Sequence, residues 1–254
     1  MTKRDKTRYH IPNLSRGMTV LEYLSSHPSG RTLSQAAEDL GFPMNSIYRI
    51  IATLEDQGYV TMDGPTRQYQ LTRKLLVLGL AQADGGTLLD QAIPVLQALR
   101  DESDETTLLG VLTENYGTVI HQVLSNQPVK VCVQIGIRFD LHSTAPGKAM
   151  LAAMPDEPLQ KRLKSMKFTK HTPRTITQIN KLKIQLEQTR KEGYATDCDE
   201  SLEGMSCVGG AILDASRQPC AAIWVTGPSS RLNPKRLKAI GKKLCQFTAS
   251  LQGT

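Results

Sequence analysis

The stretch that decides the fold is GFPMNSIYRIIATLEDQGYV, residues 41–60. One predicted helix in this stretch has side chains that face the protein interior and side chains that face outward. An inward-facing stripe with the spacing i, i+3, i+4, i+7 is formed by Ile47, Ile50, Ile51 and Leu54. The side chains left to face outward are Met44, Asn45, Ser46, Tyr48, Arg49 and Thr53. This outward set carries an amide, hydroxyls and a guanidinium, so it is suited to contact a polar surface.

A second predicted helix lies just before this one. Thr32 and Gln35 have the spacing of a capping box at its start, and Gly41 is placed to end it. The connection Gly41-Phe42-Pro43 is so short that the two helices must pack at a steep angle, as in a helix-turn-helix.

Two further elements complete this unit. A helix is expected over residues 14–26, before the pair. After the pair, YVTMDGPTRQYQLT (59–72) alternates around an Asp63–Thr66 turn, which predicts a β-hairpin. Three helices followed by a hairpin wing indicate a winged helix-turn-helix domain over residues 1–72.

In such a domain the exposed start of the third helix enters the DNA major groove, where amides, hydroxyls and guanidinium groups hydrogen-bond bases or phosphates. We therefore predict contacts to double-stranded operator DNA from Met44, Asn45, Ser46, Tyr48 and Arg49. Arg67, on the wing, is expected to contact a phosphate or the minor groove, and Thr32 and Ser34 at the start of the second helix are expected to bind phosphate. Each polar residue alone is also explained by a soluble helix face, but the ordered set of elements favours DNA binding.

The rest of the chain predicts a linker helix and a second domain. The linker is placed at residues 73–86, and the polar DGG at 84–86 marks the boundary of a domain spanning 87–254. Helices are expected there near 87–101, 145–154, 157–166, 177–192 and 233–251, and strands near 107–113, 118–125, 129–135, 194–197, 207–213 and 219–226. Strands grouped with helices between them indicate an α+β domain with helices on the faces of a sheet.

Composition limits the classes of function. The 254 residues carry a formal net charge of +7, and no apolar run approaches the roughly 18 residues of a membrane span. The basic start MTKRDKTRYH is not followed by an apolar segment, so we expect a cytoplasmic protein without a signal peptide and without membrane contact. Five cysteines without a C-x-x-C pair favour reduced thiols over disulfides or a zinc site, and we expect neither metal nor cofactor.

The sequence also resembles a known family. The resemblance to IclR-type (isocitrate lyase regulator) bacterial transcription factors rests on GMTVLEYL (17–24), residues 31–60, RQYQLT (67–72), LHSTAPGKAMLAAMP (141–155), TRKEGYATDCDESLEGMSCVGGAILD (189–214) and AAIWVTGPSSRL (221–232). It covers nearly the whole chain. It implies a GAF-like effector-binding domain, assembly as a homodimer or homotetramer, and a regulator, either repressor or activator, rather than an enzyme.

By this resemblance the effector pocket falls on Ala145, Pro146, Asp197, Cys207, Trp224 and Thr226. The residues themselves point the same way, because Pro146 after Thr144 or Ser143 indicates a helix start, whose free N–H groups and dipole favour a carboxylate. We therefore expect a small organic acid, with Asp197 accepting a hydrogen bond.

The strand patterns around the pocket leave one question open. Alternation in CAAIWVT places Trp224 and Thr226 on one sheet face, and Gly209 and Ala211 beside Cys207 are small enough to leave room for a cavity. Trp224 either fills that cavity or forms a flat wall for a ring.

Two other readings are open from the sequence. One is an enzyme in which Cys207 is the nucleophile and His142 or His121 the base, although no nucleophile-elbow, phosphate-loop or metal-ligand pattern accompanies them. The other is an architectural DNA binder whose second domain only oligomerises.

Overall fold

The computed structural model describes residues 10–72, 74–75, 88–113 and 115–253. The chain forms two compact units, residues 1–84 and 85–254, and each is described by itself. Most of the predicted linker helix at 73–86 lies outside the described residues; Lys74 and Leu75 are helical.

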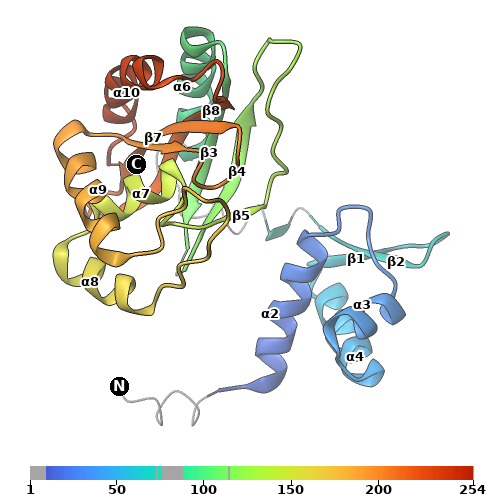
Figure 1. Ribbon diagram of the computed structural model, residues 1–254. Helices are drawn as coiled ribbons and strands as arrows, with labels where there is room; N and C mark the ends of the chain where they lie inside the picture. The colour runs from blue at the N-terminus through green and yellow to red at the C-terminus, as the bar shows by residue number, and fades with distance from the viewer. Residues whose placement is uncertain (1–9, 73, 76–87, 114, 254) are drawn as a thin grey trace. The chain divides into compact units, whose positions relative to one another are not determined.

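The first unit is a three-helix core with a hairpin (Figure 1). Its elements are α2 (Pro12–Ser25), α3 (Leu33–Leu40), α4 (Met44–Asp56), β1 (Val60–Asp63) and β2 (Gln68–Leu71). Gly41 ends α3 in the left-handed conformation at φ 64°, as its position predicts. The hairpin is antiparallel, and Arg31 and Tyr69 exchange backbone hydrogen bonds of 3.1 and 2.7 Å that tie it to the segment before α3.

One small apolar core holds this unit together. It is formed by Val20, Leu24, Ala36, Ile47, Ile50, Ile51 and Val60. Since each helix and the first strand contribute to it, the three helices and the wing fold as one body.

The second unit is a six-stranded antiparallel sheet with helices on both faces (Figure 1). In chain order its elements are α6 (Leu88–Ser103), β3 (Thr106–Leu112), β4 (Gly117–Val123), β5 (Arg138–Phe139), α7 (Ala145–Ala153), α8 (Asp156–Ser165), α9 (Ile179–Glu192), β6 (Ala195–Cys198), β7 (Met205–Leu213), β8 (Pro219–Pro228) and α10 (Pro234–Ala249). The strand order is β5-β4-β3-β8-β7-β6.

Alternation along β8 sorts the side chains between two cores. Ala221, Ile223 and Val225 pack with α6 and α10 on one face, while Ala222 packs with α7, α8 and α9 on the other. The two units together confirm the predicted α+β class, with an N-terminal winged helix-turn-helix and a C-terminal α/β sheet domain.

The prediction of a strand at residues 129–135 is wrong. This segment follows β4 without joining the sheet, although its valines alternate. Side chains hold its backbone instead: the Gln122 amide donates to the carbonyl of Val133 (2.6 Å) and accepts from its N–H (3.0 Å), and the Thr106 hydroxyl donates to the Val131 carbonyl (2.7 Å). These side chains take the backbone groups that a neighbouring strand would otherwise pair.

None of the helices among the described residues combines the length and apolar character that a bilayer crossing requires. All five cysteines are free thiols.

Candidate functional site

Helix α4 divides into a buried and an exposed side. Ile47 and Ile51 are 0 and 1 % exposed, whereas Met44 is 46 % and Tyr48 60 % exposed. Asn45 and Arg49 are exposed as well, and Ser46 is half-buried. The inward and outward positions are those that the helical spacing predicts.

The start of α3 is locked by its own side chains. The Thr32 hydroxyl accepts from the backbone N–H of Gln35 at 3.3 Å, and the Gln35 side chain accepts from the N–H of Thr32 at 3.0 Å. This capping box occupies the Thr32 hydroxyl oxygen, so the exposed Ser34 is the better placed of the two hydroxyls for an outside partner.

Arg67 follows the turn of the wing. It is exposed and adopts a left-handed backbone at φ 53°, and its N–H donates to the Asp63 carbonyl at 2.8 Å. The turn fixes the backbone of Arg67 and leaves its side chain to solvent.

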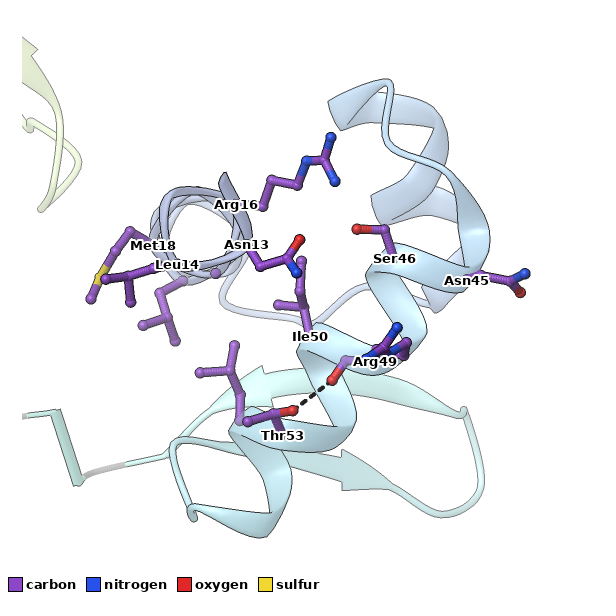
Figure 2. Close-up of a pocket in the computed structure, with 12 residues that line it drawn as sticks. Asn13, Leu14, Arg16, Met18, Asn45, Ser46, Arg49, Ile50 and Thr53 are labelled. Carbon is purple, nitrogen blue, oxygen red and sulfur yellow. Dashed lines mark hydrogen bonds between the residues drawn. The ribbon is translucent and has the colours of Figure 1, made fainter. Parts of the chain in front are cut away.

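A groove runs between α2 and α4 on this unit, with a volume of about 540 Å³ (Figure 2). Ser46 projects from α4 toward α2, while Asn45 projects from α4 away from α2. Asn13 and Arg16 of α2 line the same groove as Ser46 and Arg49. Neither α2 residue is among the predicted DNA contacts, although their i, i+3 spacing at a helix start places them on one side of that helix.

The second unit contains a cavity of about 450 Å³. Its lining comes from β4, β5, the start of α7, β6, β7, β8 and the loops between them. The lining residues are Tyr116, Val119, Val133, Ile137, Arg138, Phe139, Asp140, Ser143, Thr144, Pro146, His171, Asp197, Ser201, Cys207 and Trp224.

The structure brings four of the six expected pocket residues to this cavity. Pro146, Asp197, Cys207 and Trp224 line it. Ala145 is fully buried and is not part of the lining, and Thr226 lies behind it, where its hydroxyl accepts from the Cys207 thiol at 3.2 Å. Ala145 and Thr226 therefore lie next to this cavity without lining it.

The first turn of α7 offers fewer free donors than expected. The Thr144 hydroxyl caps the N–H of Gly147 at 3.2 Å, and Pro146 has no N–H. Of the first three helical residues, Ala145 alone has an N–H for which the described part of the chain offers no partner, and this residue is fully buried. The neighbouring Ser143 hydroxyl is a further polar group here: it is fully buried and has no hydrogen-bond partner among the described residues.

The room expected above Gly209 is filled by protein. A β-carbon on Gly209 would lie 2.9 Å from the backbone nitrogen of Pro146, so the glycine allows α7 to approach the sheet rather than opening a space. The cavity lies beside this contact, over Cys207 and Trp224.

Asp197 is a hydrogen-bond acceptor whose partners are internal. One carboxylate oxygen accepts from the Glu200 N–H at 2.8 Å and the other from the Ser201 hydroxyl at 2.5 Å. Burial raises the pKa of Asp197, and the Ser201 hydrogen bond opposes that shift. Both carboxylate oxygens of Asp197 therefore already accept hydrogen bonds from the protein. These bonds lessen the repulsion between Asp197 and a bound anion.

A buried ion pair supports this wall from behind. The Lys148 ammonium of α7 is 2.6 Å from a Glu200 carboxylate oxygen and 2.8 Å from the Gln185 side-chain oxygen, and Lys148 is 1 % exposed. Burial raises the pKa of Glu200, while Lys148 opposes the shift. Because Glu200 also donates its N–H to Asp197, the ion pair fixes one side of the cavity.

The geometry does not support a Cys–His catalytic pair. The Cys207 thiol bonds to Thr226, and burial raises its pKa, so it stays protonated. The imidazole of His142 is bonded through Nε2 to the Thr169 carbonyl at 2.9 Å. A nucleophile needs an adjacent base, and Cys207 has a hydroxyl there instead.

Most of the lining residues that the sequence analysis missed come from loops. His171, whose Nε2 lies 2.7 Å from an Asp140 carboxylate oxygen, belongs to the segment between α8 and α9, and Val133 and Ile137 belong to the segment between β4 and β5. Side-chain periodicity carries no information about such segments, because they have no regular face.

Comparison with known proteins places both units in one family. The family model of the IclR helix-turn-helix domain matches residues 13–64, and that of the bacterial transcriptional regulator IclR C-terminal domain matches residues 81–252. The transcriptional repressor IclR of Escherichia coli K12 is 30% identical over 233 residues, which cover 91% of this chain and 85% of that protein.

Solved structures agree with this match. The IclR protein of Thermotoga maritima is 27% identical with a TM-score of 0.70, over 95% of this chain and 98% of that one. An IclR homologue of Microbacterium hydrocarbonoxydans, solved in complex with 4-hydroxybenzoate, shares the fold at 19% identity with a TM-score of 0.79, over 94% of this chain and 98% of that one.

Proposed function

This chain belongs to the IclR family of bacterial transcriptional regulators, and from that membership we propose that its DNA binding is controlled by a small organic acid held in the cavity of the second unit. As a member of the family it is a DNA-binding transcriptional regulator and not an enzyme. What we propose beyond this is which residues contact DNA, what the cavity binds, and how the chain assembles.

For DNA, we propose that the exposed start of α4 lies in the major groove. Asn45, Ser46 and Arg49 carry the groups that hydrogen-bond base edges, and Met44 and Tyr48 offer apolar surface beside them. Ser34 and Arg67 are proposed to contact phosphates, with Thr32 supporting the start of α3 through its capping box. We add Asn13 and Arg16, because they line one groove with Ser46 and Arg49.

For the effector, the observation that carries the proposal is the buried Ser143 hydroxyl. Ser143 belongs to the lining of a cavity of about 450 Å³ beside the start of α7, and its buried hydroxyl has no hydrogen-bond partner within the described ranges. A buried hydroxyl without a partner is unfavourable, and a carboxylate oxygen near the positive end of a helix would satisfy it. A domain used only for oligomerisation would not need such a cavity.

We propose that the chain works as a homodimer or homotetramer. Apolar side chains stay exposed on and just before α2, with Ile11 at 62 %, Leu14 at 57 % and Met18 at 55 %, and a second copy would cover them. Two recognition helices in a dimer would read two half-sites about one DNA turn apart.

Footprinting of the DNA upstream of this gene tests the proposed function. We expect one protected region at moderate salt, whose occupancy changes when a carboxylic acid that stabilises the protein is added. The variant Ser46→Ala should weaken protection, whereas Ser165→Ala, an exposed serine of the second unit, should not. Uniform protection at every sequence, unchanged by any such acid, would refute the proposal.

A further inference from the structure

The positive charge of the chain is concentrated in one layer of the second unit, and we propose that this layer binds the phosphate backbone of duplex DNA. The layer consists of α8, α9 and the segment 166–178 that joins them, and we call it the basic layer. Together with α7 it covers one face of the sheet, while α6 and α10 cover the other (Figure 1). This role is separate from the operator contacts of the first unit and needs no effector; it rests only on the chain being a DNA-binding regulator.

The two helical layers differ in charge. From residue 156 to residue 191 the sequence has ten Lys/Arg and three Asp/Glu, a formal charge of +7 that equals the charge of the whole chain. In α6 and α10 together, six Lys/Arg stand against three Asp/Glu. Two of those acidic residues pair with cations of the same layer, Glu102 with Lys243 and Asp101 with Arg100.

Most cations of the basic layer have no acidic partner. The ion pairs that the described residues form there are Lys161–Glu157, Arg190–Asp156 and Arg174–Asp199. Six lysines have neither an ion pair nor a hydrogen bond within the described part of the chain: Lys164, Lys167, Lys170, Lys181, Lys183 and Lys191. Lys183 is half-buried and the other five are exposed, so their ammonium groups are accessible to a large partner.

Helix stability does not account for several of these lysines. Lys181 is the third residue of α9, whose first turn contains no acidic residue. Because that end of a helix is the positive end of its dipole, a cation there is unfavourable. Lys167 and Lys170 lie outside the helices, so they make no helical i, i+4 pair. A polyanion bound from outside would relieve the repulsion among these charges.

The segment between the two helices is held in place around Lys170. The carbonyl of Thr169 lies 2.9 Å from Nε2 of His142, and Nε2 of His171 lies 2.7 Å from a carboxylate oxygen of Asp140. Lys170 therefore projects from a backbone that is tied on both sides. A charge on a fixed backbone loses less conformational entropy on binding than a charge on a free loop.

The side chains of the basic layer fit phosphates better than a protein surface. Protein interfaces are enriched in aromatic residues and Arg and depleted in Lys. Here Lys is the commonest of the exposed residue types, no described Phe, Tyr or Trp is exposed, and the large exposed apolar side chains are Ile179 and Ile184. Ammonium groups bind phosphates without reading sequence, so the layer would add affinity for every DNA sequence.

Neutralising the layer tests this assignment. Lys167→Gln/Lys170→Gln/Lys181→Gln removes three exposed charges from the full chain. Each phosphate contact adds about 0.9 to the slope of log affinity against log salt concentration. For a labelled duplex of random sequence, followed by fluorescence anisotropy, we expect this slope to become shallower by about 2–3 and the affinity at low salt to fall about tenfold or more.

A matched control separates the layer from the net charge. Lys235→Gln/Lys238→Gln/Lys242→Gln removes three exposed charges from α10, on the other face of the sheet, and gives the same net charge. This variant should keep the wild-type slope. Equal losses in the two triple variants would overturn the assignment, because the effect would then follow net charge alone.

Arginine separates charge from folding. Lys167→Arg/Lys170→Arg/Lys181→Arg keeps the three charges and should bind the random duplex as wild type does. If the arginine variant loses as much affinity as the glutamine variant, the lysines act through the fold and not as phosphate contacts, and the assignment is wrong.

The remaining outcomes overturn different statements. A wild-type chain that binds neither the random duplex nor the DNA upstream of its gene would contradict DNA binding itself. A glutamine variant with the wild-type slope would contradict only the role of the basic layer. If that variant instead loses binding to polyglutamate, the layer fits an acidic protein surface and not DNA.

Discussion

Arg49 illustrates how single residues of α4 separate structure from recognition. Its side chain is exposed, while its backbone carbonyl accepts from the Thr53 hydroxyl at 2.8 Å inside the helix (Figure 2). Removing the side chain therefore leaves the helix and its buried isoleucines intact. Any loss of DNA binding then reports a lost contact to DNA.

We predict that Arg49→Ala weakens binding to the operator by about 1–3 kcal/mol if the guanidinium reads a base. Fluorescence anisotropy with operator and scrambled duplexes at one salt concentration measures the loss. A base contact lowers operator affinity alone. An equal loss on both duplexes would assign Arg49 to a phosphate, and no loss on either would remove it from the interface.

His142 gives a pH-dependent prediction. Burial lowers its pKa from 6.5, and its Nε2–H donates to Thr169, so protonation would add a second buried N–H at Nδ1, which has no partner among the described residues. The unfolded chain takes up this proton near pH 6.5 but the folded chain only at lower pH. The free energy of unfolding that His142 contributes is therefore present above pH 6.5 and decreases as the pH falls through the depressed folded value.

Urea unfolding of wild type and His142→Gln between pH 7.5 and pH 5 tests this. Wild type should lose more stability than the variant over that range. A variant that loses as much as wild type would show that other groups cause the acid sensitivity.

At this scale local periodicity predicted the buried and exposed positions of α4. The four expected pocket residues that line the cavity came from the resemblance to the IclR family. The sequence did not predict that α7 occupies the space above Gly209, or that the Ser143 hydroxyl has no hydrogen-bond partner among the residues that the structure describes. Those facts depend on how closely two elements approach, which no local pattern records.

Among the elements, the helices were predicted well because their ends carry chemical signals. Thr32 with Gln35 and Gly41 delimit α3, and Thr144 and Asn233 cap α7 and α10. The segment 129–135 shows the opposite case. Alternating valines satisfy the side-chain rule of a strand, but a strand also needs a neighbour to pair with, and here Gln122, Thr106 and Arg231 bind the backbone instead.

We predict that Gln122→Leu frees this segment. The variant loses both hydrogen bonds to the backbone of Val133, which lines the cavity, while leucine keeps the apolar part of the side chain. Amide exchange at Val133 should therefore accelerate, and exchange within β3 and β8 should not. Unchanged exchange at Val133 would show that other contacts hold the segment.

We also predict that the capping box of α3 sets local stability in the first unit. Thr32→Ala removes the side-chain acceptor for the Gln35 N–H, which should destabilise α3 by about 1 kcal/mol. Amide exchange within α3 should accelerate about fivefold. Thr32→Ser retains the hydroxyl and should stay close to wild type, so similar acceleration in both variants would refute the role of the cap.

For the whole molecule, the proposal requires that the two units communicate. It also requires a conformation of the chain that binds DNA and a conformation that does not. An acid can change DNA affinity only if it binds one of these two conformations more tightly than the other. The sequence predicts the two units and a linker at 73–86 through which such coupling would pass. Coupling is a difference between states, so it has to be measured with both ligands present.

The most direct measurement is an anisotropy titration of the full chain onto an operator duplex and a scrambled duplex at about 150 mM salt, each with and without a carboxylic acid that stabilises the protein. We predict that the operator is bound at least a hundredfold more tightly than the scrambled duplex, and that the acid shifts operator affinity several-fold. Equal affinity for both duplexes, unaffected by the acid, would contradict the account of this chain as an effector-controlled, sequence-specific regulator.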